Sequence, residues 1–204
     1  MVILRPEFSS RDSQYQIPPD ILSQLRQTPW CASILDNPTS LSIQLHSRSP
    51  SPHLVGRYSF MSRTLLTAET VPVWQGFYRP SSHSDPTDND CGEVRVLVML
   101  GSGMDGHLRT AHSGVAATLL DETMGTVGGI HKTPGKSILT AFMHVDYKKP
   151  LPTPSVVMIK AKLDPRSGGR KLYIRATLED GNGTEFNAAE ALFLEVKRKP
   201  RTKI

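Results

Sequence analysis

The sequence of 204 residues contains no long apolar run, and hydrophobic residues make up an ordinary 38% of it. A helix that spans a bilayer needs about 20 consecutive apolar residues, so the sequence predicts neither a membrane-spanning helix nor a membrane partner. The first residues also lack the apolar core of a signal peptide, and Glu7 and Asp12 are atypical of a transit peptide. We therefore expect a cytoplasmic protein.

Cysteine is almost as scarce, because the chain has only Cys31 and Cys91. Small secreted proteins that depend on disulfides carry several pairs, and two isolated cysteines do not form such a framework. Reduced thiols are the expectation, which agrees with a cytoplasmic location.

The excess of positive charge is confined to one end of the chain. The net charge is +5, and five basic residues with no acid among them lie in the tail: Lys197, Arg198, Lys199, Arg201 and Lys203. Without them the basic and acidic residues balance, so the domain itself is not basic. We interpret residues 197–204 as a solvated basic tail and expect no nucleic-acid partner. Contact of this tail with an anionic surface is the alternative.

Residues 1–53 are predicted to be an N-terminal helical extension and linker. Pro18-Pro19-Asp20 is typical of a helix start, and Trp30–Leu35 forms a second short helical segment. The large side chains of the segment Trp30–Leu35 are expected to dock the extension on the rest of the protein. Alternatively, this segment forms a lid over a ligand channel. The Ser- and Pro-rich residues 38–52 are predicted to be a connector.

Residues 54–196 are predicted to be one domain. Within it, six segments show the alternation of apolar and polar residues that is typical of strands. They cover residues 65–79, 93–100, 138–147, 157–163, 172–178 and 186–196. Pro72 favours a strand start or an edge, residues 80–90 are a polar loop, and Asp180-Gly181-Asn182-Gly183 is a hairpin signal. Consecutive strands joined by short turns predict an antiparallel sheet, and one long apolar helix against it gives an α+β layer arrangement.

The strand over residues 138–147 is expected to turn one set of side chains to the core, namely Leu139, Ala141, Met143, Val145 and Tyr147. The alternation then places Thr140, Phe142 and His144 on the opposite face, which suits an interface.

The chain is organised around the stretch His112–Gly125, a loop that turns into an apolar helix. Ser113 is the expected N-cap, and Gly128-Gly129 is the expected stop signal. The free N–H groups at such a helix start suit an oxyanion. Asp121 follows an uncharged run from Val115 to Leu120, and a buried helix has little use for an acid unless it is paired or does chemistry.

This stretch resembles the signature of hotdog-fold thioesterases of the PaaI type, in which His-Gly-Gly is followed by a small and aliphatic run into an Asp. Asp121 lies nine residues after His112, the spacing of that family, and Gly106-His107 resembles the Gly-His that precedes the motif in fungal members. The resemblance continues to about Val196, and the departure is Ser113, where the family has its first Gly. It implies a hotdog fold, in which a curved antiparallel sheet wraps around one long central helix.

The resemblance further implies hydrolysis of a small-molecule acyl thioester, on coenzyme A or on an acyl-carrier protein. Asp121 would be the base or the nucleophile, and the N–H groups of Ser113 and Gly114 would form the oxyanion hole. Thr140 would orient water. His112 would position the loop or touch the thioester carbonyl.

Other residues near the motif are candidates for substrate binding: His107, Ala117, Glu122 and Gly125. Ala117 and Gly125 lie one turn either side of Asp121 and leave room beside it. Glu122 is rotated by about 100° from Asp121, so both acids cannot face one site equally. Glu122 either replaces Asp121 or is a structural acid. No Cys or carboxylate accompanies the histidines at zinc-like spacing, so we expect no metal and no cofactor.

Two alternatives stay open. Ser113 at the oxyanion corner also fits a hotdog protein with a repurposed site, which either binds a ligand or partner without hydrolysis or dehydrates or cyclises a polyketide-like substrate.

The resemblance also implies a homodimer or a dimer of dimers, with Asp121 of one chain approaching residues near Thr140 of the other. An open sheet edge supports pairing of two chains.

Overall fold

The computed structural model describes residues 16–48, 58–81 and 92–197. Most of the expected N-terminal loop, Cys91, most of the polar loop 80–90 and the tail beyond Lys197 lie outside these residues. The helical elements are α1 (Pro19–Arg26), α2 (Pro29–Leu35), η1 (His46–Arg48), η3 (Phe60–Thr64), η4 (Ser102–Met104) and α3 (Ser113–His131). The strands are β1 (Leu41–Ile43), β2 (Val73–Arg79), β3 (Glu93–Leu100), β4 (Asp105–His107), β5 (Thr110–Ala111), β6 (Lys136–Tyr147), β7 (Ser155–Leu163), β8 (Lys171–Glu179) and β9 (Glu185–Lys197).

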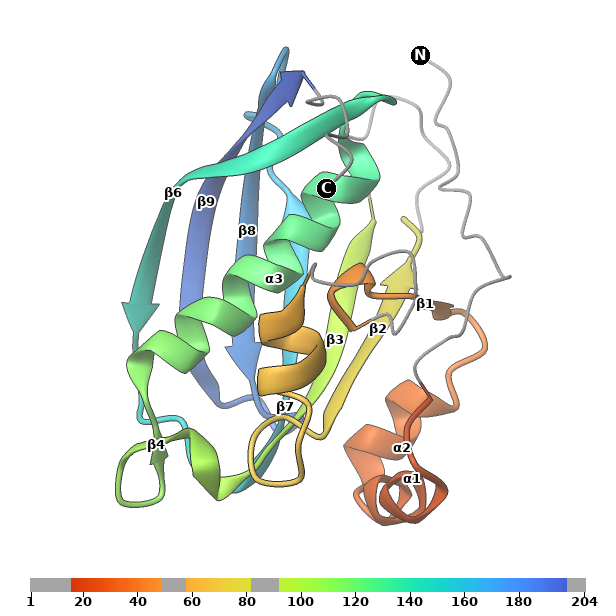
Figure 1. Ribbon diagram of the computed structural model, residues 1–204. Helices are drawn as coiled ribbons and strands as arrows, with labels where there is room; N and C mark the ends of the chain where they lie inside the picture. Colours follow the sequence, from red (N-terminus) through yellow and green to blue (C-terminus); the bar gives the residue numbers. More distant parts are fainter. Residues whose placement is uncertain (1–15, 49–57, 82–91, 198–204) are drawn as a thin grey trace, which may run out of the picture.

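Seven strands form one antiparallel sheet in the order β1-β2-β3-β7-β8-β9-β6. The sheet curves around α3, which crosses its inner face diagonally (Figure 1). β6 follows α3 in the chain but pairs only with β9, so it forms one edge of the sheet. The predicted α+β arrangement of one helix against one antiparallel sheet is confirmed.

The main hydrophobic core lies between α3 and the sheet. Alternate residues of β3, β7 and β8 point inward and are buried against α3: Val94, Val96, Val98, Val157, Ile159, Ala161, Leu172, Ile174, Ala176 and Leu178. From α3 the core receives Leu119, Leu120 and Met124, all 0% exposed. The period of two in these strands therefore predicts their buried face correctly.

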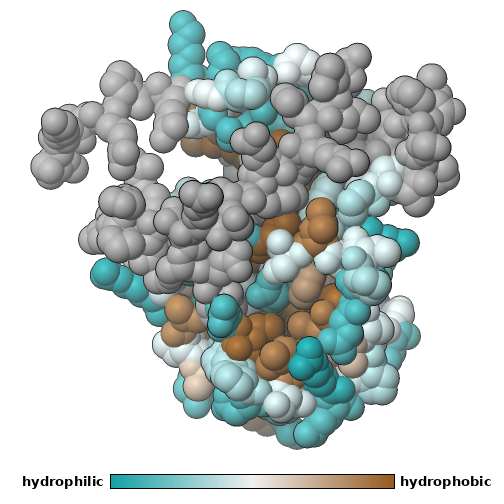
Figure 2. Space-filling model, turned by 90° about the vertical axis from the view of Figure 1, so that its right-hand side faces the viewer, coloured by the Kyte–Doolittle hydropathy of each residue, from teal (hydrophilic) through white to brown (hydrophobic). Residues whose placement is uncertain are grey.

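A second core lies on the outer face of the sheet, where α1 and α2 pack against β2, β3 and β7. Leu25, Cys31 and Ile34 of these helices contact buried residues of the strands, among them Phe77 and Leu97. The predicted docking of the N-terminal helices is confirmed. Figure 2 shows the side of the molecule that carries them, with apolar side chains gathered in its lower half.

Part of the predicted connector belongs to the sheet instead. β1 pairs antiparallel with β2, with Ile43 opposite Gly76, and η1 follows it. A side chain at position 76 would come within 2.9 Å of Ile43 and Leu45, so Gly76 lets this short segment lie close to β2. The strand predicted from residue 65 begins only at Val73, directly after Pro72, as the proline indicates. The position of the boundary between residues 53 and 54 stays a prediction.

α3 is longer than predicted, because it continues through Gly128-Gly129 to His131. A Cβ at position 128 would lie 2.8 Å from Cδ1 of Ile138. Gly128 therefore marks a close approach of helix and strand, and the expected stop signal is wrong. No helix among the described residues is long and apolar enough to cross a membrane.

The predicted inner face of β6 is wrong in its first half. The pairing of β6 with β9 is irregular between Thr140 and Phe142, which leaves Ala141 as an extra residue. Such a bulge switches the face that alternate residues occupy. Ile138 therefore packs on the core and Leu139 is 62% exposed, whereas Met143 and Val145 beyond the bulge pack inward as predicted.

Candidate active site

The start of α3 is capped by His112. Its Nδ1 accepts a hydrogen bond from the N–H of Gly114 at 3.0 Å, and its carbonyl accepts one from Val115 at 2.8 Å. The predicted N-cap, Ser113, is instead the first residue of the helix. One donor of the predicted oxyanion hole, the Gly114 N–H, is thus bonded to the imidazole of His112.

The hairpin of β4 and β5 packs directly on this helix start. A Cβ at Gly106 would lie 2.7 Å from Cα of His112, so only glycine fits there. The carboxylate of Asp105 accepts hydrogen bonds from the backbone N–H of Arg109 at 3.1 Å and from the hydroxyl of Thr153. His107 lies on this hairpin and is exposed. The hairpin thereby holds the loop before α3 in place, and Asp105 is a residue that sequence reasoning missed.

Asp121 and Thr140 are brought together as predicted, but within one chain. The Thr140 hydroxyl donates to Oδ1 of Asp121 at 3.0 Å. Thr140 lies just before the bulge of β6, so it faces α3 rather than the outer face shared by Phe142 and His144. A contact of Asp121 with residues near Thr140 of a second chain stays a prediction.

Tyr147, at the other end of β6, reaches the start of the same helix. Its hydroxyl donates to the carbonyl of Ser113 at 3.2 Å, and its side chain remains 53% exposed. β6 thus contacts α3 at Asp121 and again at Ser113, which ties together the two parts of the candidate site. The sequence predicts the inward direction of Tyr147 but not this bond.

The helix surface around Asp121 carries small residues on both sides. Ala117 and Gly125, one turn away on either side, are half-buried. A Cβ at Gly125 would meet nothing closer than Phe193 at 3.9 Å, an ordinary contact, so crowding does not require glycine at this position. The predicted room beside the carboxylate stays a prediction.

Glu122 lies on a different flank of α3. Burial raises the pKa of its carboxyl, while a hydrogen bond from Ser47 lowers it, the neighbouring charge of Asp121 raises it and that of Arg48 lowers it. Ser47 and Arg48 belong to η1, in the N-terminal extension. The two adjacent acids of α3 thus face different partners, as their rotation on the helix predicts.

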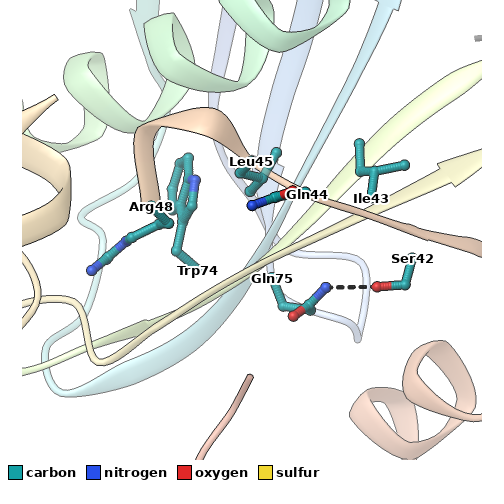
Figure 3. Close-up of a pocket in the computed structure, with 7 residues that line it drawn as sticks. All are labelled: Ser42, Ile43, Gln44, Leu45, Arg48, Trp74 and Gln75. Carbon is teal, nitrogen blue, oxygen red and sulfur yellow. Dashed lines mark hydrogen bonds between the residues drawn. The ribbon is translucent and has the colours of Figure 1, made fainter. Parts of the chain in front are cut away.

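A small cavity lies between β1, η1 and β2 (Figure 3). Its volume of about 20 Å³ has room for about one water molecule. Arg48 and Trp74 line it, and Asp121 does not. It is too small to hold an acyl group.

Among the described residues, no three His, Cys, Asp or Glu side chains come together as a metal site would need.

Comparison with known proteins identifies the part of the chain that carries this site. Residues 108–186 match the family model described as the thioesterase superfamily. These residues are less than half of the chain, and they are similar to the thioesterase superfamily. The resemblance expected from the motif between His112 and Asp121 is therefore confirmed, and so is the hotdog fold of one curved sheet around α3.

Three relatives show the range of the similarity. Verlamelin biosynthesis protein B of Lecanicillium sp is 27% identical over 173 residues, which cover 70% of this chain and 74% of that protein. The acyl-coenzyme A thioesterase THEM4 of rat is 32% identical over 110 residues, covering 51% of this chain and 44% of that one. The mouse protein of the same name is 36% identical, covering 54% and 47%. The chain thus spans less than half the length of the THEM4 proteins that it matches.

Solved structures of thioesterases are similar as well. The E. coli PaaI protein from the phenylacetic acid degradation operon has a TM-score of 0.47 and 10% identity, and the match covers 51% of this chain and 72% of that one. A thioesterase superfamily protein with 25% identity has the same TM-score and covers 58% and 53%.

Proposed function

We propose that this protein hydrolyses an acyl thioester, with Asp121 as base or nucleophile. The hydrogen bond between Thr140 and Asp121, beside the small residues Ala117 and Gly125, carries the proposal. A carboxylate oriented by a hydroxyl has the geometry that a base or nucleophile needs. The match of residues 108–186 to the thioesterase superfamily model supports this reaction class.

In the base form of the reaction, Asp121 takes a proton from water while the water oxygen attacks the thioester carbonyl carbon. The carbonyl oxygen becomes an oxyanion that the N–H groups of Ser113 and Gly114 stabilise, and the C–S bond then breaks with protonation of the thiolate. Because Nδ1 of His112 now accepts the Gly114 N–H, the substrate oxygen would take the place of that nitrogen. In the nucleophile form, a carboxylate oxygen of Asp121 attacks the carbonyl carbon, the C–S bond breaks with release and protonation of the thiolate, and water then opens the resulting anhydride.

The substrate is proposed to be an acyl-CoA, because the rat and mouse relatives carry the name acyl-coenzyme A thioesterase. An acyl-carrier protein thioester is the other member of the same chemical class. A panel from acetyl-CoA to palmitoyl-CoA, with thiol release as readout, tests both the activity and the chain length. Asp121→Asn should abolish turnover, and an undiminished rate in this variant would contradict the assignment.

Single turnover in H₂¹⁸O separates the two forms of the mechanism. A nucleophilic Asp121 incorporates ¹⁸O into its own carboxylate when the anhydride opens at the enzyme carbonyl, and a general base does not. Mass spectrometry of the peptide that contains Asp121 reads the difference.

A repurposed site is the second candidate, and the bond between Gly114 and His112 favours it. An oxyanion donor that is already satisfied, with a serine side chain beside it, suits binding or another acyl reaction without hydrolysis. Ser113→Gly tests this alternative. A large gain in hydrolysis would support the repurposed site, and an unchanged rate would support the thioesterase.

We further propose a homodimer that forms through the open edge of β6. Among the residues that the structure describes, this strand pairs on one side only, and Leu139 and Phe142 on its outer face are 62% and 47% exposed. Proteins usually pair or cover such an edge. Light scattering should give twice the chain mass, and a monomer with full activity at nanomolar concentration would exclude a site that needs two chains.

The cytoplasm is the proposed compartment. One relative, an uncharacterized protein of Candida albicans with 32% identity, is named mitochondrial. Imaging of a fluorescent fusion against a mitochondrial marker decides between the two.

A further inference from the structure

The hairpin of β4 and β5 is bound to residues 148–154, which connect β6 to β7. The backbone N–H of Ala111 donates to the carbonyl of Leu151 at 2.8 Å. The backbone N–H of Thr153 donates to the carbonyl of Arg109 at 3.2 Å. The connection thus runs beside the hairpin and is joined to it by two backbone hydrogen bonds.

Asp105 adds two side-chain bonds to this joint. Its Oδ1 accepts a hydrogen bond from the hydroxyl of Thr153, and its Oδ2 accepts one from the backbone N–H of Arg109 at 3.1 Å. Thr153 is 3% exposed, so water has little access to its side chain. Arg109 has a φ of +56°, a conformation that residues with a Cβ rarely adopt. Such a conformation persists only when the surrounding contacts hold it, and the carboxylate of Asp105 supplies two of them.

The same hairpin determines where the main chain of His112 lies. The backbone N–H of His112 donates to the carbonyl of Met104 at 2.9 Å. A Cβ at Gly106 would lie 2.7 Å from Cα of His112, so the backbone of Gly106 packs directly on the histidine. Met104 and Gly106 are the two neighbours of Asp105 in the chain. Whatever holds Asp105 therefore also holds His112.

His112 in turn sets the start of α3. Its Nδ1 accepts the N–H of Gly114 at 3.0 Å, and its carbonyl accepts the N–H of Val115 at 2.8 Å. The proposed oxyanion donors, Ser113 and Gly114, follow it directly. Such donors stabilise a transition state because they are already aimed at the developing charge. A misplacement of about 1 Å can cost roughly 100-fold in rate.

We propose that Asp105 is a positioning residue for the oxyanion hole. Through its two hydrogen bonds it fixes the hairpin, and the hairpin fixes the main chain of His112. The N–H groups of Ser113 and Gly114 are thereby aimed before a thioester binds. The imidazole ring can leave Gly114 by rotation of its side chain while the main chain stays in place. This inference rests on the proposed hydrolysis, although its geometry can be tested without activity.

Kinetics of the full chain with the acyl-CoA panel test the proposal. Asp105→Ala removes both acceptors, and we expect kcat to fall roughly 10- to 100-fold with little change in KM. Asp105→Asn removes the charge but can keep both bonds. Its amide oxygen accepts the N–H of Arg109, and its amide nitrogen donates to the hydroxyl of Thr153, which can accept as well as donate. This variant should therefore keep most of the wild-type kcat.

Asp164→Ala is the matched control for a merely structural role. Oδ1 of Asp164 accepts the backbone N–H of Arg166 at 2.8 Å, so this aspartate also holds a turn through a backbone bond. Its turn follows the end of β7, whereas Thr153 precedes the start of the same strand. We expect Asp164→Ala and Asp105→Ala both to unfold at lower urea concentrations than the wild type. The kcat per folded molecule should stay at the wild-type value in Asp164→Ala.

Hydrogen exchange of the Gly114 N–H, followed by NMR, gives a readout that does not depend on turnover. The bond to Nδ1 of His112 slows this exchange in the wild type. Exchange should be faster in Asp105→Ala, and it should match the wild type in Asp105→Asn and in Asp164→Ala.

Two results would overturn the positioning role. One is a wild-type kcat in Asp105→Ala. The other is a kcat of Asp105→Asn that falls as far as that of Asp105→Ala, because the charge rather than the two hydrogen bonds would then matter. If the wild type hydrolyses no thioester, the proposed function fails, and the exchange of the Gly114 N–H alone decides the positioning role.

Discussion

Replacement of Thr140 by Val is the sharpest test of the candidate site. The two side chains have nearly the same shape, so the change removes little more than the hydroxyl that donates to Oδ1 of Asp121 at 3.0 Å. A hydrogen bond to a charged group contributes about 1.5–3 kcal/mol. Thr140 is exposed, so water can partly replace the donor, and we expect a loss nearer about 1–1.5 kcal/mol.

That loss corresponds to about a five- to tenfold lower rate. It should reduce kcat rather than raise KM, because the hydroxyl orients Asp121 or the attacking water and does not hold the acyl group. The assay is thiol release from an acyl-CoA, measured over a range of concentrations for both parameters. Thr177→Val in β8 is the matched control, since Thr177 is a strand threonine on the face away from α3.

Two results would refute this reasoning. One is a rate of Thr140→Val that equals that of Thr177→Val. The other is a raised KM with an unchanged kcat in Thr140→Val, because the hydroxyl would then hold the substrate rather than orient Asp121 or the attacking water.

Three further predictions concern stability and reactivity. Burial raises the pKa of Glu122, so ionisation of its carboxyl opposes folding. The free energy of unfolding of the wild type should therefore fall relative to that of Glu122→Gln as pH rises from about 4 through this raised pKa. Parallel curves of unfolding free energy against pH for the two proteins would contradict this prediction. Burial also raises the pKa of the Cys31 thiol to about 11, so Cys91→Ser should not react with a disulfide reagent at pH 8 until urea unfolds it. A Cβ at Gly181 would lie 2.0 Å from the ring of Trp30, so Gly181→Ala should cost about 1–3 kcal/mol in urea unfolding, and clearly less in a Trp30→Ala background.

The strands with an uninterrupted alternation are the part of the fold that sequence predicts best. β3 covers the same residues as the expected strand, and the buried residues of β8 are those that the alternation places on one face. One side of each strand packs on α3, so a single physical requirement produces the period. The short helices α1 and α2 follow from local signals too, since a proline occupies the start of each.

Contacts between distant segments were not predictable in the same way. β1 has only three residues, and its place beside β2 depends on Gly76, some 30 positions later in the chain. Gly128 is a residue type that is typical of a helix stop, but its role here is to let the side chain of Ile138 lie close to α3. In both cases glycine is required by the structure, but the reason is a close side chain from a distant part of the sequence.

The bulge at Ala141 explains why the site itself was only half predicted. Simple alternation pairs Thr140 with Phe142 and His144 on an outer face, and that assignment leads to a contact between two chains. With one extra residue in β6, Thr140 faces inward together with Met143 and Val145, and the same spacing produces a contact within one chain. The choice of Thr140 as a partner of Asp121 therefore came from the family resemblance, whereas the geometry of the contact depends on where the strand is interrupted.

The cap at His112 has a consequence for both candidate functions. A helix start offers N–H groups to an anion only while they are not already bonded, and Nδ1 of His112 accepts the one from Gly114. A thioester oxygen can bind there only if the imidazole moves, and Gly106 packs against His112 on one side. The hydrolytic and the non-hydrolytic candidates thus differ in one event, the displacement of this imidazole by a substrate oxygen. Ser113, which follows the histidine directly, adds a side chain to the corner through which that oxygen must enter.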